Sequence, residues 1–333
     1  MRKRIKTLTV SMLMVATLLS GCTIGDTEYV LDLNAVGRND VLSINGEECS
    51  KEEARLYLCN YQNLYGNEYG INLWGYDFSV EEAPATLEEY VKDITILQLS
   101  NIMCMNQLAK EMDIELTKEE EELLKQVTSV YYDSLSEEEL AYMELEKKEL
   151  QNFYTKYAVA EKLYNTLTQG VNEEVSIDEA RVISVQQIYV TTKSAANEVL
   201  EELEEGSKFI HVANSYNEAK IIETTYARGE LPKDVEKAAF ALDNNEVSDV
   251  IETDDGYYFF YCLSKNEVEL TEKNKENIIA KRRKEQFDDV FEAFVKDSEF
   301  QLNQKVWESI IIDTSGNITT DSFFEVYNTY FHE

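Results

Sequence analysis

Apolar residues recur every three or four positions along most of the chain, which is the spacing that places them on one face of an α-helix. This spacing predicts helices at about 87–112, 118–134 and 137–169, and a long charged helix within 270–308. Capping boxes of the Ser/Thr-x-x-Glu type mark helix starts at Ser50, Thr86, Thr117, Ser136 and Ser176. A helical framework is therefore expected on both sides of the chain's middle.

The spacing changes after Gly170, where apolar and polar residues begin to alternate as they do in β-strands. Strands are predicted at 182–190, 247–252 and 257–263, and helices at 194–205, 208–217 and 233–241, the last two joined by a loop. These elements together predict a compact α+β unit.

The two patterns indicate one domain inserted into another, so the predicted fold class is α+β. We expect a mostly helical domain that is split between 40–180 and 268–310, with an α+β domain at 181–267 inserted in it. The remaining segments are expected to be a signal peptide (1–21), a tether (22–39) and a C-terminal tail (311–333).

The N-terminus has the features of a secretory signal. Basic residues precede an apolar stretch from Leu8 to Leu19, which is too short for a comfortable membrane span. The following Leu18-Leu19-Ser20-Gly21-Cys22 resembles the lipobox of bacterial lipoproteins. The resemblance implies cleavage before Cys22 and a lipid anchor on its sulfur, at the extracytoplasmic face of the cell membrane. The alternative is a plain signal with an incidental cysteine.

The composition narrows the classes of partner. The formal net charge is −34, and removal of the basic signal peptide makes the mature chain more acidic still. Nucleic acid is therefore excluded as a partner, as is flat docking onto anionic lipid. The negative charge either keeps the body off the membrane, favours basic clients, or simply reflects solvated helix faces.

Histidine and cysteine usage argues against metal chemistry. Only His211 and His332 are present, so a histidine-rich metal site is excluded, and no metal or cofactor is expected. The cysteines after Cys22 contain no C-x-x-C pair and lie in apolar contexts, which favours buried free thiols over a disulfide framework at Cys49, Cys59, Cys104 and Cys262.

Two adjacent amides, Gln186 and Gln187, interrupt the apolar strand VQQIYV. Neighbouring side chains of a strand point to opposite faces, so one of these amides is expected to point inward. A buried amide requires hydrogen-bond partners. The strand therefore predicts either a site or the remnant of one.

Residues 182–265 resemble the parvulin family of peptidyl-prolyl isomerases, most clearly in RGELPKDVEKAAFALDNNEVSDVIETDDGYY. The helical flanks, with the opening VLSINGEECSKEEA, are similar to the chaperone segments of PrsA- and SurA-type extracytoplasmic foldases. The resemblance covers roughly residues 40 to 310 and implies a chaperone-like helical domain. It also implies that unfolded or secreted polypeptides are the partners.

The resemblance also implies where a peptide site would lie. Gln187 and Tyr258 stand where active parvulins have two facing histidines, and Glu218 is the nearest substitute for the family's acidic or thiol residue. The proline pocket maps to Tyr226, Leu231, Val235 and Phe240, with Thr253 retained nearby and Glu223 in place of an apolar wall residue. We expect Gln187 and Tyr258 to form a structural hydrogen-bonding pair beside a shallow slot floored by Leu231 and Val235.

Three functional hypotheses remain open, and the oligomeric state is open in all of them. The chain is a membrane-anchored folding factor with a degenerate peptide-binding domain, or an active isomerase with a rebuilt site. The third hypothesis is a structural lipoprotein that docks a fixed partner.

The lipobox generates a direct prediction. Replacing Cys22 by serine removes the sulfur that would carry the lipid, so we expect C22S to be released into the medium or to accumulate as an uncleaved precursor. Cell fractionation and immunoblotting measure this. Membrane fractionation identical to that of the unmodified chain would contradict the assignment.

Overall fold

The computed structural model describes residues 37, 39–69 and 86–332. The expected signal peptide, the expected tether and Cys22 lie outside this range, apart from residues 37 and 39 of the tether. The chain divides into two compact units: one comprises residues up to Gly170 together with Lys284 onward, and the other comprises Val171–Arg283. The combination of helices with small antiparallel sheets makes the fold α+β, as predicted. No helix in the described ranges is long and apolar enough to cross a membrane.

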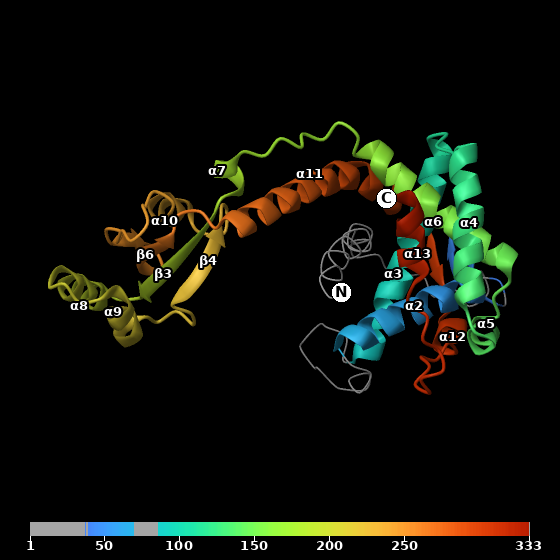
Figure 1. Ribbon diagram of the computed structural model, residues 1–333, viewed down its shortest axis with the longest axis horizontal. Coiled ribbons are helices and arrows are strands. Elements are labelled where there is room, and N and C mark those ends of the chain that lie inside the picture. The colour runs from blue at the N-terminus through green and yellow to red at the C-terminus, as the bar shows by residue number, and fades with distance from the viewer. Residues whose placement is uncertain (1–36, 38, 70–85, 333) are drawn as a thin grey trace, which may run out of the picture. The chain divides into compact units, whose positions relative to one another are not determined.

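The first unit is mainly helical (Figure 1). Its small sheet has the order β2-β1-β7, in which the central strand pairs with both neighbours in antiparallel fashion. Its elements are β1 Asp40–Ile44, β2 Glu47–Ser50, α2 Lys51–Tyr69, α3 Leu87–Glu111, α4 Lys118–Ser134, α5 Glu137–Met143, α6 Lys147–Leu167, the C-terminal part of α11 Val268–Lys296, β7 Phe300–Leu302, α12 Gln304–Glu308 and α13 Phe323–Phe331.

The capping boxes determine several helix starts. At Thr86, Thr117 and Ser136 the side chain accepts a bond from the backbone of a glutamate three residues on, and that glutamate reaches back to the cap. One expected helix, 137–169, is instead two, because Glu144 adopts a left-handed conformation (φ 54°) that ends α5. Leu145 follows in the core, and α6 begins after Glu146.

The C-terminal segment is a structural part of the first unit, and the expectation of a tail at 311–333 is wrong. Phe323 and Tyr327 of α13 are buried. The Phe323 ring stacks on Tyr154 of α6 with centroids 4.2 Å apart, and the Tyr154 hydroxyl donates to the Phe323 carbonyl at 2.9 Å. The aromatic spacing of FFEVYNTYF is that of an amphipathic helix, and this signal was present in the sequence.

A buried carboxylate holds the chain that leads into α13. Glu139 of α5 accepts backbone N–H bonds from Thr319 and Thr320, at 2.9 and 2.8 Å, and a third from Ser136 at 2.9 Å. Burial by itself would raise the pKa of Glu139, but these hydrogen bonds outweigh it and lower the pKa below its ordinary value of 4.5. The carboxylate is therefore charged when the segment is docked.

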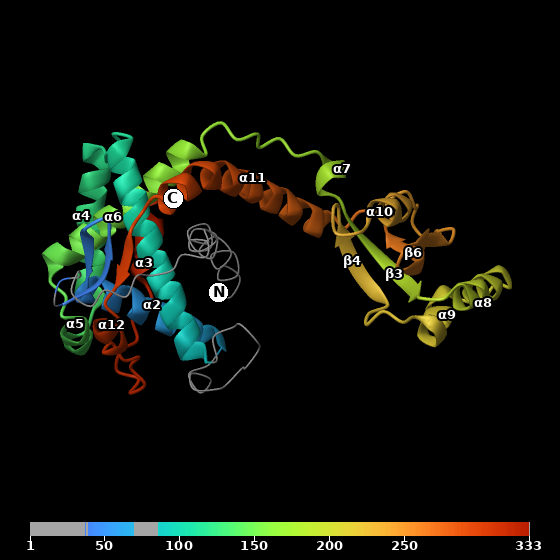
Figure 2. The same cartoon turned by 180° about the vertical axis from the view of Figure 1, so that it is seen from behind.

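The second unit is built on a four-stranded antiparallel sheet with the order β4-β3-β6-β5 (Figure 2). Side chains from one face of the sheet pack with α10, and those from the other face pack with α8 and α9. Its elements are α7 Ile177–Ala180, β3 Val182–Val190, α8 Lys193–Glu204, α9 Phe209–Tyr216, β4 Glu223–Ala227, α10 Lys233–Ala239, β5 Ile251–Thr253, β6 Gly256–Ser264 and the N-terminal part of α11.

Two strands of this sheet differ from the prediction. The expected loop between α9 and α10 contains β4, an edge strand that pairs with β3. The expected strand 247–252 is shortened to β5, and Val247 forms only an isolated bridge with Tyr261. The sequence of β4, ETTYA, is partly exposed, as is typical of an edge strand. Its apolar and polar residues alternate too weakly to predict a strand.

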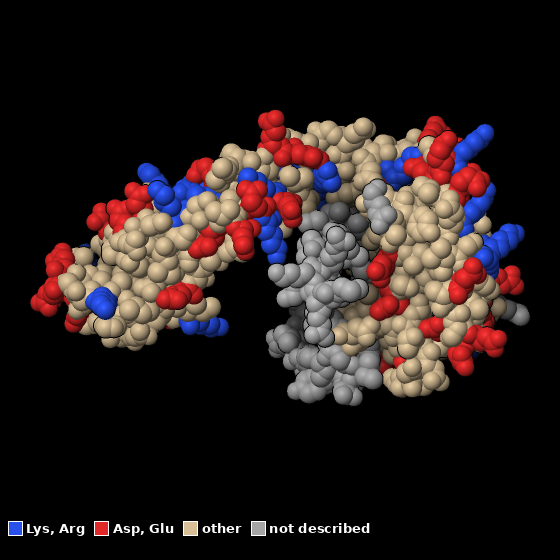
Figure 3. All heavy atoms as spheres, in the orientation of Figure 1, with Lys and Arg blue, Asp and Glu red and all other residues tan. Residues whose placement is uncertain are grey.

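Charged residues are spread over the surfaces of both units. Figure 3 shows acidic side chains dispersed over the visible face of each unit, interspersed with basic ones. This distribution is typical of solvated helix faces, which keep a strongly acidic chain soluble without forming a single acidic patch.

The hydrogen bonds of Glu139 generate a pH-dependent prediction. Glutamine at this position keeps only one acceptor oxygen, so E139Q should lower the free energy of unfolding of the first unit by about 2–3 kcal/mol at pH 7. Because the folded pKa is lowered, the charged group's contribution is complete above pH 4.5 and declines as the pH falls through the folded pKa. The difference between unmodified chain and variant should therefore shrink in acid.

Urea unfolding followed by tryptophan fluorescence measures this, since Trp307 is buried in the first unit and residues 171–283 contain no tryptophan. The matched control is E138Q, at an exposed position in the same helical turn. Equal stabilities of the two variants at pH 7 would show that Glu139 does not hold the C-terminal segment.

Candidate functional site

One face of the sheet in the second unit brings together most of the residues expected to form a peptide site. Val235 and Phe240, from α10 and the residue that ends it, are buried against β3 and β6. Tyr226, Leu231 and Tyr258 lie at the border of this cluster and are partly buried. The part of the expected pocket that remains accessible is therefore its border, whereas Val235 and Phe240 belong to the core beneath.

The amides of Gln186 and Gln187 are both buried, and that of Gln187 has two partners. Its side chain is almost fully buried, its Oε1 accepts from the Tyr226 hydroxyl at 2.7 Å, and its Nε2 donates to the Ile221 carbonyl at 2.9 Å. These bonds satisfy the amide at both ends, so it needs no ligand. Gln187 thus connects β3 to β4 and to the segment before β4.

Gln186 points to the other face of the sheet and has its own partner there. Its Nε2 donates to Glu223 Oε1 at 2.7 Å. Glu223 therefore lies on the face opposite to Tyr226, because the two residues are three positions apart on one strand. The expectation that Glu223 forms a polar wall of the pocket is wrong.

The expected hydrogen bond between Gln187 and Tyr258 is not formed. The register of β3 and β6 places Gln187 opposite Phe260, and Tyr258 opposite Tyr189. The Tyr258 ring contacts the Tyr189 ring with centroids 4.8 Å apart and stacks on Phe260 at 6.2 Å. Gln187 and Tyr258 are therefore diagonal neighbours, and the amide uses the nearer hydroxyl of Tyr226.

The ring of Tyr189 is a site residue that the sequence analysis missed. It shares a face with Gln187, two positions along β3, and strand alternation could have identified it. Its hydroxyl donates to the Asp255 carbonyl at 2.5 Å, which ties β3 to the turn before β6. The adjoining Gly256 has φ 148°, and a Cβ there would lie 2.6 Å from the Val190 carbonyl oxygen.

Glu218 and Thr253 lie outside the cluster. Glu218 Oε2 accepts from the Thr191 hydroxyl at 2.8 Å, near the end of β3. Thr253 donates to the Gly256 carbonyl at 2.9 Å and stabilises the β5–β6 turn. Both therefore have local structural partners, and neither contacts Gln187 or Tyr258 among the hydrogen bonds of the described chain.

The tyrosines of the cluster are neutral at physiological pH. Burial raises the pKa of Tyr226, although the hydrogen bond to Gln187 works in the opposite direction. Burial also raises the pKa of Tyr258, with further increases from Tyr189 and Asp255. Among the described residues no group of three or more His, Cys, Asp or Glu side chains is placed to hold a metal ion.

Comparisons with known proteins match this part of the chain to a family. The PPIC-type PPIASE domain matches residues 146–274. The foldase protein PrsA of Clostridium botulinum (strain Loch Maree / Type A3) is 21% identical over 305 residues, which cover 81% of this chain and 90% of that protein. Over most of its length the chain is therefore similar to a PrsA foldase.

Two further proteins are similar to parts of the chain. Foldase protein PrsA 1 of Listeria monocytogenes is 29% identical over 148 residues, covering 39% of this chain and 50% of that protein. A crystal structure of the PrsA peptidylprolyl isomerase from Bacillus cereus is 20% identical and covers 76% of this chain and 99% of its own, with a TM-score of 0.36.

The histidine content of the matched range can be read from the sequence. The matched range contains one histidine, His211, which lies exposed on α9. The other histidine, His332, lies outside the range. Whatever the alignment, this domain therefore contains no pair of facing histidines. That Gln187 and Tyr258 occupy the two histidine positions stays a prediction.

The Gln187–Tyr226 bond generates a prediction about stability. Y226F removes the donor and leaves a buried amide oxygen unpaired, which should cost the second unit about 1–2 kcal/mol. Hydrogen exchange of the β3 amides measures this, and protection should fall by about 5–30-fold.

The matched control is Y258F. No hydrogen bond of the Tyr258 hydroxyl occurs within the described chain, so its removal should change β3 protection little. If Y258F reduces protection as much as Y226F, the amide is not held as described.

Proposed function

We propose that this chain is a membrane-anchored extracytoplasmic folding factor that binds unfolded secreted polypeptides. In this proposal its parvulin-like domain is degenerate: it retains an apolar peptide-binding border but has little isomerase activity. The observation that carries the second part is the Gln187 amide, whose two ends are bonded to Tyr226 and Ile221.

The binding of unfolded polypeptides is supported by the extent of the family likeness. The likeness to the C. botulinum foldase extends over 90% of that protein, so it includes the helical unit as well as the PPIC-type domain. Unfolded secreted chains expose apolar segments, and a folding factor has to hold them weakly enough to release them. The acidic surface supports a preference for clients that are not themselves strongly acidic.

Weak isomerisation is supported by what the cluster contains. The barrier to proline isomerisation is about 20 kcal/mol and arises from amide resonance, so catalysis needs groups that favour the twisted amide. The domain has no histidine pair, and Gln187 is already engaged within the fold. An apolar slot alone binds a proline ring in both states, which lowers the barrier little.

A specific observation favours the second candidate, an active isomerase with a rebuilt site. Tyr226, Leu231 and Tyr258 remain partly exposed around an apolar core, and two of them carry hydroxyls. A hydroxyl can donate to an amide as it twists. The active isomerase predicts a faster rate of proline isomerisation than the degenerate domain does. A proline tetrapeptide assay therefore separates the two candidates.

Membrane anchoring is proposed from the sequence alone. The motif ending in Cys22 follows a basic region and a short apolar stretch, as a lipoprotein signal does. A lipid anchor would keep the folding factor where secreted chains emerge.

The proposal predicts three measurable outcomes. Turnover of a proline tetrapeptide should be at least about two orders of magnitude below that of an intact parvulin, because transition-state hydrogen bonding is missing. Any residual rate should be constant between about pH 6 and pH 9, since the pKa values of Tyr226 and Tyr258 are raised above 10.0 and glutamine does not titrate. The chain, at a concentration equal to that of an unfolded client, should suppress aggregation of that client.

Leu231→Ala should weaken binding of a proline-containing peptide about threefold, since part of an apolar contact is lost. The control is Leu263→Ala, at an exposed leucine of β6 that lies outside the cluster. Rapid turnover that is lost in L231A would establish the active isomerase instead. Failure to suppress aggregation would refute the folding-factor assignment.

A further inference from the structure

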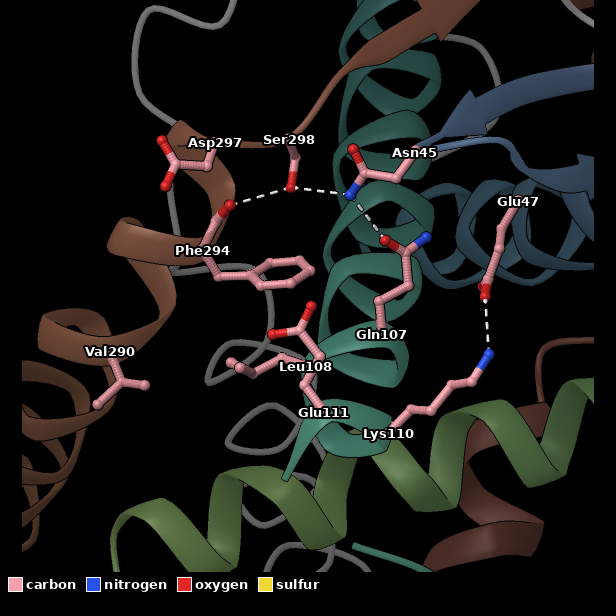
Figure 4. Close-up of a pocket in the computed structure, with 10 residues that line it drawn as sticks. All are labelled: Asn45, Glu47, Gln107, Leu108, Lys110, Glu111, Val290, Phe294, Asp297 and Ser298. Atoms are coloured by element: carbon pink, nitrogen blue, oxygen red, sulfur yellow. Dashed lines mark hydrogen bonds and ion pairs between the residues drawn. The ribbon is translucent and has the colours of Figure 1, made fainter. Parts of the chain in front are cut away.

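A groove of about 760 Å³ opens within the first unit between α3, the β1–β2 turn and the C-terminal part of α11. Figure 4 shows side chains of α3 and α11 facing each other across it. We call it the α3–α11 groove. It is lined by Asn45, Glu47, Gln107, Leu108, Lys110, Glu111, Val290, Phe294, Asp297 and Ser298. Its volume lies in the range of ligand sites, which is large enough for apolar side chains of a polypeptide.

The back wall of the α3–α11 groove is a hydrogen-bonded network. Asn45 Nδ2 donates to Gln107 Oε1 at 2.8 Å and to Ser298 Oγ at 3.2 Å. Gln107 Nε2 donates to the Ile44 carbonyl at 2.8 Å, and Asn45 Oδ1 accepts from the backbone of Glu299 at 2.8 Å. The network joins the three elements that form the groove, so its shape is established before any ligand binds.

The floor of the groove is apolar. Leu108 is buried at the base, and the ring of Phe294 points from α11 towards it (Figure 4). Val290, one turn earlier on α11, keeps 39% of its surface exposed. Exposed apolar side chains beside a cavity can bury the apolar side chain of a partner, which provides the driving force for binding.

The rim of the groove is acidic and mostly unpaired. The carboxylates of Glu111 and Asp297 make no ion pair among the described residues. Glu47 and Lys110 are 3.9 Å apart, and both side chains remain largely exposed. An exposed pair of this kind is weak, so the carboxylates at the rim outweigh its single ammonium group.

We propose that the α3–α11 groove binds client segments in which apolar side chains are flanked by lysine or arginine. The inference rests on the proposed folding-factor function and names the class of polypeptide that it takes. The floor buries the apolar side chains, while the carboxylates of Glu111 and Asp297 pair with the flanking cations. Acidic segments are repelled by the same carboxylates, so the groove discriminates by charge as well as by hydrophobicity.

The test uses fluorescence anisotropy of two short labelled peptides with the same leucine-rich centre, one flanked by lysines and one by glutamates. The full mature chain should bind the lysine-flanked peptide at least about tenfold more tightly, and added salt should reduce the difference. E111K reverses a rim charge and should weaken that binding at least about fivefold. V290S removes apolar surface from the floor and should weaken it about threefold.

Matched controls separate the groove from general effects. E115K makes the same change of charge at an exposed residue just beyond α3, outside the groove. V130S makes the same change at a valine of α4 that is 44% exposed and also outside it. Both controls should bind the lysine-flanked peptide as the unmodified chain does.

Three outcomes would overturn the inference. Equal binding of the two peptides would refute the charge preference, and equal losses in variants and controls would place the binding site elsewhere. If sedimentation shows a dimer that V290S and E111K dissociate, the groove is an interface between two copies of the chain. The folding-factor function is tested separately, by the aggregation assay. If the unmodified chain suppresses aggregation while the groove variants bind the lysine-flanked peptide normally, the inference fails and the folding-factor function stands.

Discussion

The ring of Phe323 lies against aromatic side chains from three other helices of the first unit. It stacks on Tyr154 of α6, and it contacts Tyr57 of α2 at 5.4 Å and Tyr131 of α4 at 5.6 Å. These helices belong to the part of the chain before the second unit, whereas α13 follows it. The helical core is therefore complete only when the segments before and after the second unit are both present.

The second unit, unlike the first, does not depend on distant parts of the chain for its core. An inserted unit folds independently when its apolar core is formed by its own residues. The sheet β4-β3-β6-β5 carries separate apolar clusters on its two faces, and no member of either cluster belongs to the first unit. The second unit thus satisfies its own packing, while the first depends on contacts between distant parts of the sequence.

The two units also differ in how polar groups are used. In the second unit the buried amide of Gln187 is bonded within the fold, and the tyrosines around it are neutral. In the first unit the amides of Asn45 and Gln107 brace a groove whose rim carboxylates are left for solvent or a partner. Polar side chains therefore stabilise the candidate site in one unit and organise an open surface in the other.

The sequence by itself determined the features that arise from neighbouring residues. The capping boxes at Thr86, Thr117 and Ser136 start helices where they were predicted, because their hydrogen bonds join residues three apart. The alternation in VQQIYV predicted a strand, and this stretch lies in β3, where both amides are buried rather than one. The absence of a histidine pair from the PPIC-type domain also follows from the sequence alone, since it is a matter of counting.

Only the tertiary structure decided which distant residues meet. The partner of Gln187 is Tyr226 rather than Tyr258, because strand register places Tyr258 opposite Tyr189. The edge strand β4 has a weak local pattern and depends on pairing with β3. The sequence predicted a tail after residue 310, but Glu139 and Tyr154 bind this segment through hydrogen bonds. Strand register and long-range packing depend on many contacts between distant residues, so they cannot be predicted from a short stretch of sequence.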